Sequence, residues 1–191
     1  MIHDWIHPVS VLIVGELKAG EKTAAELSKD LELPYNLVYR RLKKLESAGL
    51  VSHGEKKKGI TFSLNSRDPA VRCLLRFHEV LRFREVLQTA NPRVRAAAIE
   101  VIETFEEKFP DLAVDLFFYG SFAKGTSRRG SDVDALVVVP EERVKEVEKE
   151  IADIITAHVF VMDRKMFEEK KREAGPYVRS VLAGIHLRLP L

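Results

Sequence analysis

The chain is almost free of cysteine, and that scarcity argues against several classes of protein. Among 191 residues there is one cysteine, Cys73, so no internal disulfide framework can form. Chains without disulfides are typical of reducing compartments, and we expect a cytoplasmic protein. Six histidines are present, but none stands in the spacing that zinc sites use. We therefore expect neither a disulfide-stabilised secreted domain nor a zinc protein.

Long hydrophobic runs are also missing. No stretch reaches the length of a membrane span, and the N-terminus lacks the pattern of a signal peptide, so we expect no membrane association. Asparagine and glutamine are scarce while 31% of the residues are charged, a balance that fits proteins of thermophilic organisms. The net charge of +2 does not by itself indicate a nucleic-acid partner.

What the chain does contain is an acidic pair beside a glycine–serine turn. Gly120-Ser121 follows the apolar run 116–119, and Ser131-Asp132-Val133-Asp134 leads into the apolar run 135–139, which predicts a buried strand. Alternate residues of a strand share a face, so Asp132 and Asp134 should project together. Paired carboxylates suit Mg²⁺, which takes further ligands from substrate phosphates. We predict both as metal ligands and catalytic residues.

The neighbouring residues are of the kinds that hold phosphates. Gly120 has no Cβ and lets a phosphate approach the backbone, and Ser121 opens a short helix whose free N–H groups favour an anion. The alternative is a plain helix cap followed by a turn, and there is no P-loop sequence. The predicted phosphate-binding set is Gly120, Ser121, Lys124, Arg128, Arg129 and Ser131.

The motif Gly120-Ser121-x-x-Lys124-Gly125 with Ser131-Asp132-x-Asp134 resembles the DNA polymerase β-type nucleotidyltransferase superfamily, and within it the minimal nucleotidyltransferases. The resemblance runs from near Asn91 to the C-terminus. It implies that Gly120 and Ser121 hold the phosphates of a nucleoside triphosphate, and that Asp132 and Asp134 hold Mg²⁺. It also implies a separate toxin chain as a partner, because minimal nucleotidyltransferases often act as antitoxins.

One position departs from that superfamily. Its active members carry a third acidic residue on a later strand, and on the predicted strand 158–162 that place is taken by His158. Asp163 is acidic but lies at the end of the strand. The third carboxylate is expected to act as the base or to bind a second metal, so its absence puts catalysis in doubt.

The first third of the chain predicts three helices and a hairpin. Thr23 and Glu26 form a capping box at the start of a helix 24–31. A third helix runs from Pro34 or Tyr35 to Ala48-Gly49, with Leu37, Leu42 and Leu45 towards the core. The turn 54–59 precedes an alternating strand 60–64.

Residues 6–65 resemble a winged helix-turn-helix of prokaryotic transcription regulators, which implies that the third helix enters the major groove of duplex DNA. The predicted DNA contacts lie on the outward face of that helix and at the wing tip, where basic side chains gather. They are Asn36, Tyr39, Arg40, Lys43, Lys56, Lys57 and Lys58. The alternative is a module that contacts protein.

The remaining elements complete an α+β fold with a small mixed sheet. A long helix 68–89 carries apolar residues on more than one side and predicts a homodimer contact. We expect three segments: a winged helix in 1–66, a connecting helix in 67–90 and a nucleotidyltransferase domain in 91–191. Three functions stay open. They are Mg²⁺-dependent nucleotidyl transfer, transcription regulation by a domain that senses a nucleotide, and an antitoxin role.

Overall fold

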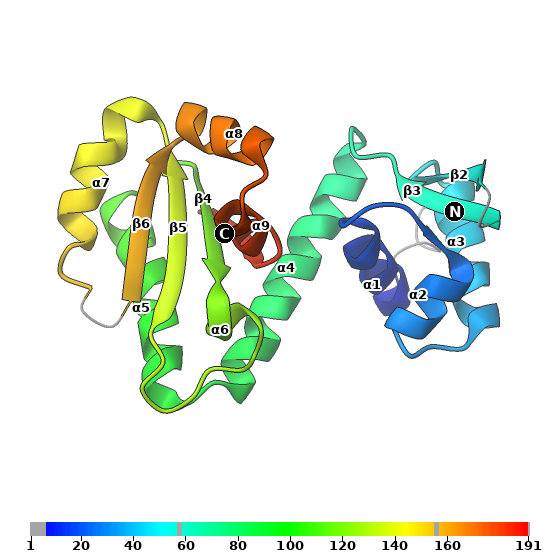
Figure 1. The fold of residues 1–191 in the computed structure, drawn as a ribbon, viewed down its shortest axis with the longest axis horizontal. Coiled ribbons are helices and arrows are strands. Elements are labelled where there is room, and N and C mark those ends of the chain that lie inside the picture. The colour runs from blue at the N-terminus through cyan, green and yellow to red at the C-terminus, as the bar shows by residue number, and fades with distance from the viewer. Residues whose placement is uncertain (1–6, 57–58, 155–156, 191) are drawn as a thin grey trace. The chain divides into compact units, whose positions relative to one another are not determined.

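A computed structural model describes residues 7–56, 59–154 and 157–190. The chain folds as two compact units, Met1–Glu79 and Val80–Leu191, each with its own hydrophobic core. The boundary falls inside the long helix α4, Pro69–Thr89 (Figure 1). In the described part of the chain, no helix has the length and apolar character needed to cross a membrane.

The first unit is the expected arrangement of helices and a β-hairpin. Helix α1 spans Pro8–Leu17, α2 spans Ala24–Asp30 and α3 spans Tyr35–Ser47. The strands β1, β2 and β3, at Lys22–Thr23, Val51–Lys56 and Gly59–Leu64, form an antiparallel sheet in the order β1-β3-β2. Both bonds of the capping box at Thr23 are present, as predicted.

One core assignment in α3 is wrong. The helix buries Val38, Leu42 and Leu45 completely, whereas Leu37 is half-buried. Val38, Leu42 and Leu45 follow the helical spacing of four and three residues, so they share one face, and Leu37 lies about 100° to the side of Val38. The prediction chose the larger aliphatic residue over the residue with the better spacing.

The second unit is built on a mixed four-stranded sheet. The strands are β4 (Val114–Tyr119), β5 (Val133–Val139), β6 (Ala157–Asp163) and β7 (Ile185–Leu189), in the order β6-β5-β4-β7. Strand β5 runs parallel to β6, and β4 runs antiparallel to both β5 and β7. The α+β class predicted from the sequence is confirmed, with the last strand at an edge.

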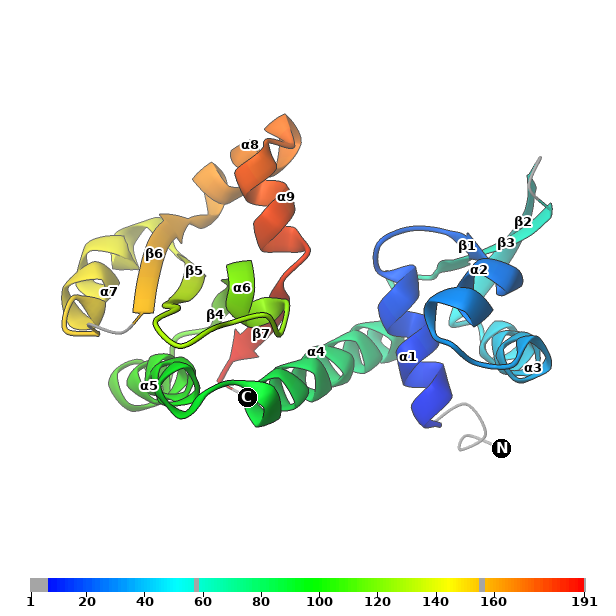
Figure 2. The same cartoon turned by 60° about the horizontal axis from the view of Figure 1, so that its bottom comes forward.

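Helices cover both faces of this sheet (Figure 2). Helix α5, Pro92–Lys108, and helix α7, Val144–Ile151, contribute to the larger core on one face. Helices α8, Arg164–Glu173, and α9, Pro176–Leu182, contribute Phe167 and Val181 to a smaller core on the other face. Between β5 and β6 the chain forms a short 3₁₀ turn, η1 at Glu141–Arg143, which leads directly into α7.

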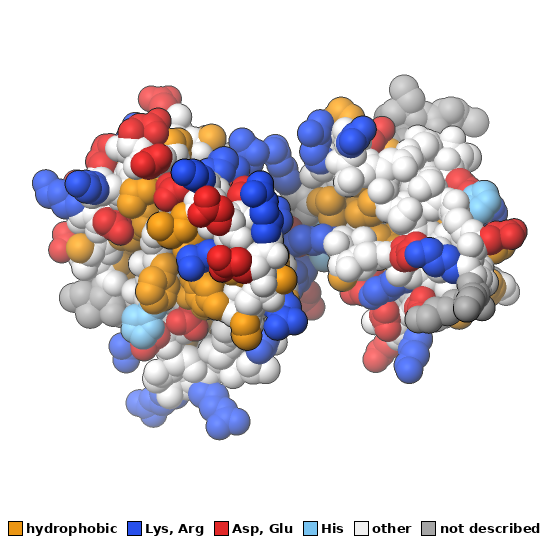
Figure 3. Space-filling view, turned by 45° about the horizontal axis from the view of Figure 1, so that its top comes forward, with side chains coloured by type: hydrophobic (Ala, Val, Ile, Leu, Met, Phe, Trp, Pro, Cys, Tyr) orange, Lys and Arg blue, Asp and Glu red, His pale blue; other side chains and the backbone are white. Residues whose placement is uncertain are grey.

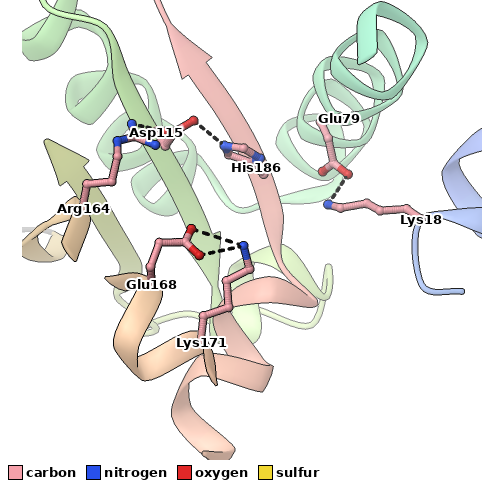
Figure 4. A network of polar contacts seen from close by, with 7 residues as sticks. All are labelled: Lys18, Glu79, Asp115, Arg164, Glu168, Lys171 and His186. Atoms are coloured by element: carbon pink, nitrogen blue, oxygen red, sulfur yellow. Dashed lines mark hydrogen bonds and ion pairs between the residues drawn. The ribbon is translucent and has the colours of Figure 1, made fainter. Parts of the chain in front are cut away.

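A buried carboxylate anchors α8 and β7 to β4. Asp115 accepts a 2.7 Å hydrogen bond from Arg164, the first residue of α8, and lies 2.9 Å from His186 Nε2 on β7 (Figure 4). Burial raises the pKa of Asp115, but the hydrogen bonds from His186 and Arg164 outweigh it and lower the pKa from 3.8 to about 2. This contact fixes the start of α8 over the sheet.

Candidate functional site

The site begins at Gly120, where β4 passes into the short helix α6, Gly120–Ala123. Gly120 has φ +70°, a conformation that favours glycine. A Cβ built at Gly120 would lie 2.4 Å from Oδ2 of Asp134. The carboxylate therefore occupies the space that the Cβ of any larger residue at position 120 would need.

The two predicted carboxylates lie together with His158. Asp134 pairs with His158 across β5 and β6, and Asp132 stands one residue before β5. The imidazole lies between them, with Nε2 3.8 Å from Oδ2 of Asp132 and Nδ1 3.7 Å from Oδ1 of Asp134. The side chains are 40%, 34% and 63% exposed for Asp132, Asp134 and His158, so all three meet solvent. Two acidic groups and one imidazole thus form an open cluster.

Asp132 and Asp134 are the residues of this cluster that could hold a divalent cation. Two half-exposed carboxylates on one side of the sheet are hard oxygen ligands of the kind that Mg²⁺ takes, with substrate phosphates completing its shell. Among the residues that the structure describes, no group of three or more His, Cys, Asp or Glu side chains is arranged as a metal site. Asp163 does not supply a third carboxylate. It lies at the other end of β6 from His158, and its side chain caps α8 by accepting a 2.8 Å hydrogen bond from the Met166 N–H.

The predicted phosphate-binding residues separate into two groups. Gly120 and Lys124 line a common pocket, and Ser121 stands beside them in α6. Arg128, Arg129 and Ser131 belong instead to the connection between α6 and β5. There the Ser131 hydroxyl accepts a 2.8 Å bond from the Arg128 N–H, so it already serves the turn.

The structure adds three residues of α9 that the sequence did not single out. Tyr177 packs edge-on against Tyr119, with ring centroids 5.6 Å apart. Burial raises the pKa of the Tyr119 hydroxyl, and a hydrogen bond with Tyr177 and the charge of Asp134 act in the same direction. Arg179 and Ser180 line the pocket that contains Gly120 and Lys124, with a volume of about 300 Å³. No local motif marks these residues, since only the docking of α9 brings them to the site.

The surface of the second unit also carries exposed apolar side chains. Phe160, two residues beyond His158 on β6, is 56% exposed, and Met166 in α8 is 46% exposed. Figure 3 shows hydrophobic side chains of this unit at the surface among acidic and basic ones. A hollow of about 430 Å³ runs along β6 and α7 and reaches the site through His158.

In the first unit, the outward face of α3 is mixed. Asn36, Arg40 and Lys43 are exposed, while Tyr39 is half-buried and stacks on Tyr35 with ring centroids 5.9 Å apart. Lys43 lies 2.7 Å from Glu46 and above the Tyr39 ring.

At the wing, one of the three predicted cations is described, and it is engaged within the protein. Lys56 forms an ion pair with Glu21. Hydrogen bonding from Lys56 lowers the pKa of Glu21. Lys57 and Lys58 lie outside the described residues.

Comparison with protein families separates the chain into the same two parts. Residues 98–182 match the nucleotidyltransferase domain, and residues 16–67 match the sugar-specific transcriptional regulator TrmB. The comparison with curated proteins gave no match.

Several solved structures are similar to parts of the chain. YusO of Bacillus subtilis is 15% identical, with a TM-score of 0.37 over 53% of this chain and 75% of that one. The adhesin competence repressor of Streptococcus pyogenes is 18% identical, with a TM-score of 0.36 over 55% and 80%. A candidate nucleotidyltransferase of Sulfolobus solfataricus is 24% identical, with a TM-score of 0.32 over 49% and 78%. By its two family matches, the chain joins a winged helix domain of the TrmB type to a nucleotidyltransferase domain.

Proposed function

We propose that the second unit transfers a nucleoside monophosphate from a nucleoside triphosphate to an acceptor hydroxyl. The observation that carries this proposal is that Asp132 and Asp134 lie together beside His158, and that Oδ2 of Asp134 occupies the place of the missing Cβ at the Gly120 turn. Asp132 and Asp134 would hold Mg²⁺, which supplies positive charge against the phosphates when bound. Gly120, Ser121 and Lys124 would hold the triphosphate.

The reaction is a displacement at the α-phosphorus. The acceptor oxygen forms a bond to the α-phosphorus, and the bond from that phosphorus to the oxygen bridging it to the β-phosphorus breaks. Pyrophosphate leaves with the electron pair, and the acceptor proton passes to a base. This chain contributes positioning and electrostatic stabilisation, which are the main sources of catalysis in phosphoryl transfer.

A second candidate function is nucleotide sensing with little turnover, and His158 favours it. The imidazole stands beside both carboxylates, where a third carboxylate is expected for the superfamily. An imidazole can accept a proton, but it cannot provide the negative charge that a second Mg²⁺ needs. Binding and transfer would then separate, with tight binding of one metal and slow chemistry.

We also propose that the first unit binds duplex DNA through α3 and the wing. The exposed side chains Asn36, Arg40 and Lys43 support this, and Arg40 and Lys43 are the cations that phosphate contacts require. The pairing of Lys43 with Glu46 and of Lys56 with Glu21 means that these cations must exchange a carboxylate for a phosphate. Binding should therefore be weak unless two copies of the unit act together.

A homodimer through α4 would bring two such units together. Cys73 and Phe77 are exposed one helical turn apart, and Leu81 continues the stripe, with Phe77 53% and Leu81 40% exposed. Light scattering tests this: Phe77→Gln should lower the mass from dimer to monomer, while Arg76→Gln should not. A wild-type protein that is monomeric at all concentrations would remove the proposal.

Calorimetry and label transfer test the proposed reaction. The protein should bind a non-hydrolysable nucleoside triphosphate in the presence of Mg²⁺, and Asp132→Ala should abolish that binding while the circular dichroism spectrum stays unchanged. Label from an α-³²P triphosphate should pass to the acceptor. Tight binding without any transfer would favour the sensing function, and unchanged binding in Asp132→Ala would contradict both.

A further inference from the structure

The pocket between α6 and α9 has a lining of unusual composition. Three of its residues carry polar or charged side chains, Lys124, Arg179 and Ser180, and the other four are glycine or alanine. None of the described residues that line it is acidic. Two cations and a hydroxyl around a cavity of about 300 Å³ make a site for a small anion.

Tight packing fixes the shape of this pocket. A Cβ at Gly184, just after α9, would lie 2.1 Å from the carbonyl oxygen of Phe118 on β4, so only glycine allows the chain to pass so close to the sheet. The Gly184 carbonyl accepts a 3.2 Å hydrogen bond from Arg82. The C-terminal end of α9 is therefore held against β4, which places Arg179 and Ser180 opposite α6.

The pocket adjoins Asp134, one of the two proposed metal ligands, at Gly120. Gly120 belongs to its lining, and Oδ2 of Asp134 lies against the same glycine. A linear anion that contacts the carboxylate-bound cation at one end can thus extend past Gly120 towards Lys124 and Arg179. The volume is at the small end of the range for ligand pockets, so it suits the outer part of a nucleotide rather than the whole molecule.

We propose that this pocket receives the β- and γ-phosphates of the nucleoside triphosphate, and holds pyrophosphate after transfer, with Arg179 as its main specificity residue. The inference rests on the proposed function for the identity of the ligand. Lys124 provides a point charge, Arg179 provides a planar fork that bonds two phosphate oxygens, and the Ser180 hydroxyl donates a third bond. The pocket thereby distinguishes a triphosphate from a monophosphate.

Calorimetry with three ligands tests this assignment. The ligands are inorganic pyrophosphate, a non-hydrolysable nucleoside triphosphate and the nucleoside monophosphate, each with Mg²⁺. Arg179→Ala should weaken pyrophosphate and triphosphate binding by roughly 10- to 100-fold, the loss of a charge-assisted hydrogen bond, and leave monophosphate binding unchanged. Arg179→Lys should recover part of the loss. Arg172→Ala, which removes an exposed arginine from α8 outside the pocket, is the matched control.

The outcomes separate this inference from the proposed function. Equal losses for all three ligands in Arg179→Ala, or no loss for any, would overturn the pocket assignment. So would a wild-type protein that does not bind pyrophosphate, even if its triphosphate binding still depends on Asp132. Conversely, pyrophosphate binding that depends on Arg179 in a protein without transfer activity would support the pocket while removing the enzymatic function.

Discussion

The sheet of the second unit carries two aspartate–histidine clusters, and they differ in how fully their charges are satisfied. Asp115 bonds His186 at 2.9 Å and Arg164 at 2.7 Å, and its side chain is only 11% exposed. Asp132 and Asp134 stand 3.7–3.8 Å from His158 and are 40% and 34% exposed. The first cluster has compensated its buried charge within the protein. The second presents two carboxylates to solvent, which is the arrangement that a ligand can complete.

The largest expected effect comes from removing one charge of the open cluster. Asp134→Asn should reduce nucleotidyl transfer on the order of 10²–10³-fold, because a bound metal supplies several kcal/mol of charge stabilisation. The free energy of unfolding should change by no more than about 0.5 kcal/mol, since the carboxylate is half-exposed. Label transfer and urea denaturation measure the two quantities.

Glu142→Gln is the control for this variant, because Glu142 is an exposed carboxylate just beyond the other end of β5. Comparable losses of transfer in both variants would mean that general charge, not the cluster, drives the effect. A large loss of stability in Asp134→Asn would mean that Asp134, like Asp115, serves mainly to stabilise the fold.

The second expected effect comes from adding a carboxylate to the open cluster of Asp132, Asp134 and His158. His158→Asp introduces a third carboxylate beside Asp132 and Asp134, and should raise transfer by about 10²-fold, the lower end of the range for a general base. Calorimetric titration should detect a second Mg²⁺ in the presence of the triphosphate analogue. His158→Asn, which cannot bind the second ion, should show neither gain. Higher activity without a second ion would assign the gain to proton transfer alone.

The third expected effect breaks the closed cluster. Asp115→Asn should lower the free energy of unfolding by about 2 kcal/mol, because the pKa of Asp115 in the folded protein is about 2 instead of 3.8. A lowered pKa contributes stability above the unfolded value, and the contribution is lost as pH falls from 3.8 towards 2. The difference in stability between wild type and variant should therefore shrink over that interval.

Urea denaturation at several pH values measures this difference, and Asp111→Asn, at an exposed position shortly before β4, is the control. A difference that stays constant down to pH 2 would mean that packing around Phe117 and His186, whose rings stack 4.2 Å apart, rather than charge, carries the contribution.

The smallest expected effect extends the comparison to the first unit, where Lys56, a cation that we propose to contact DNA, is also paired within the protein. Glu21→Gln releases Lys56 and should steepen the dependence of log affinity for duplex DNA on log salt by up to about 0.9, the value for one phosphate contact. Glu55→Gln is the control, because it changes the net charge by the same amount and the structure describes no contact between the Glu55 and Lys56 side chains. Equal slopes in the two variants would contradict the release of Lys56.

The sequence predicts local structure well and long-range docking poorly. The capping box of Thr23 and Glu26 starts α2 at Ala24 as predicted, and the apolar run 135–139 lies wholly within β5, because both signals act over a few neighbouring residues. The neighbourhood of Asp132, Asp134 and His158 follows from strand order within the recognised superfamily. The sequence could not identify Arg179 and Ser180 as site residues. Their position depends on the packing of Gly184 against the Phe118 carbonyl, a contact that no sequence motif predicts.

The contact between Gly120 and Asp134 has a consequence for how this domain can diverge. Because the carboxylate occupies the place of a Cβ at residue 120, no L-amino acid with a side chain fits there while Asp134 keeps its position. Gly120 also has φ +70°, so the backbone itself resists replacement. In related domains that no longer need Asp134, the proposed metal ligand, the aspartate should be lost before a side chain appears at position 120, and the reverse order should be rare. The pair of residues at 120 and 134 therefore indicates, in sequence alone, whether a related domain has kept this arrangement.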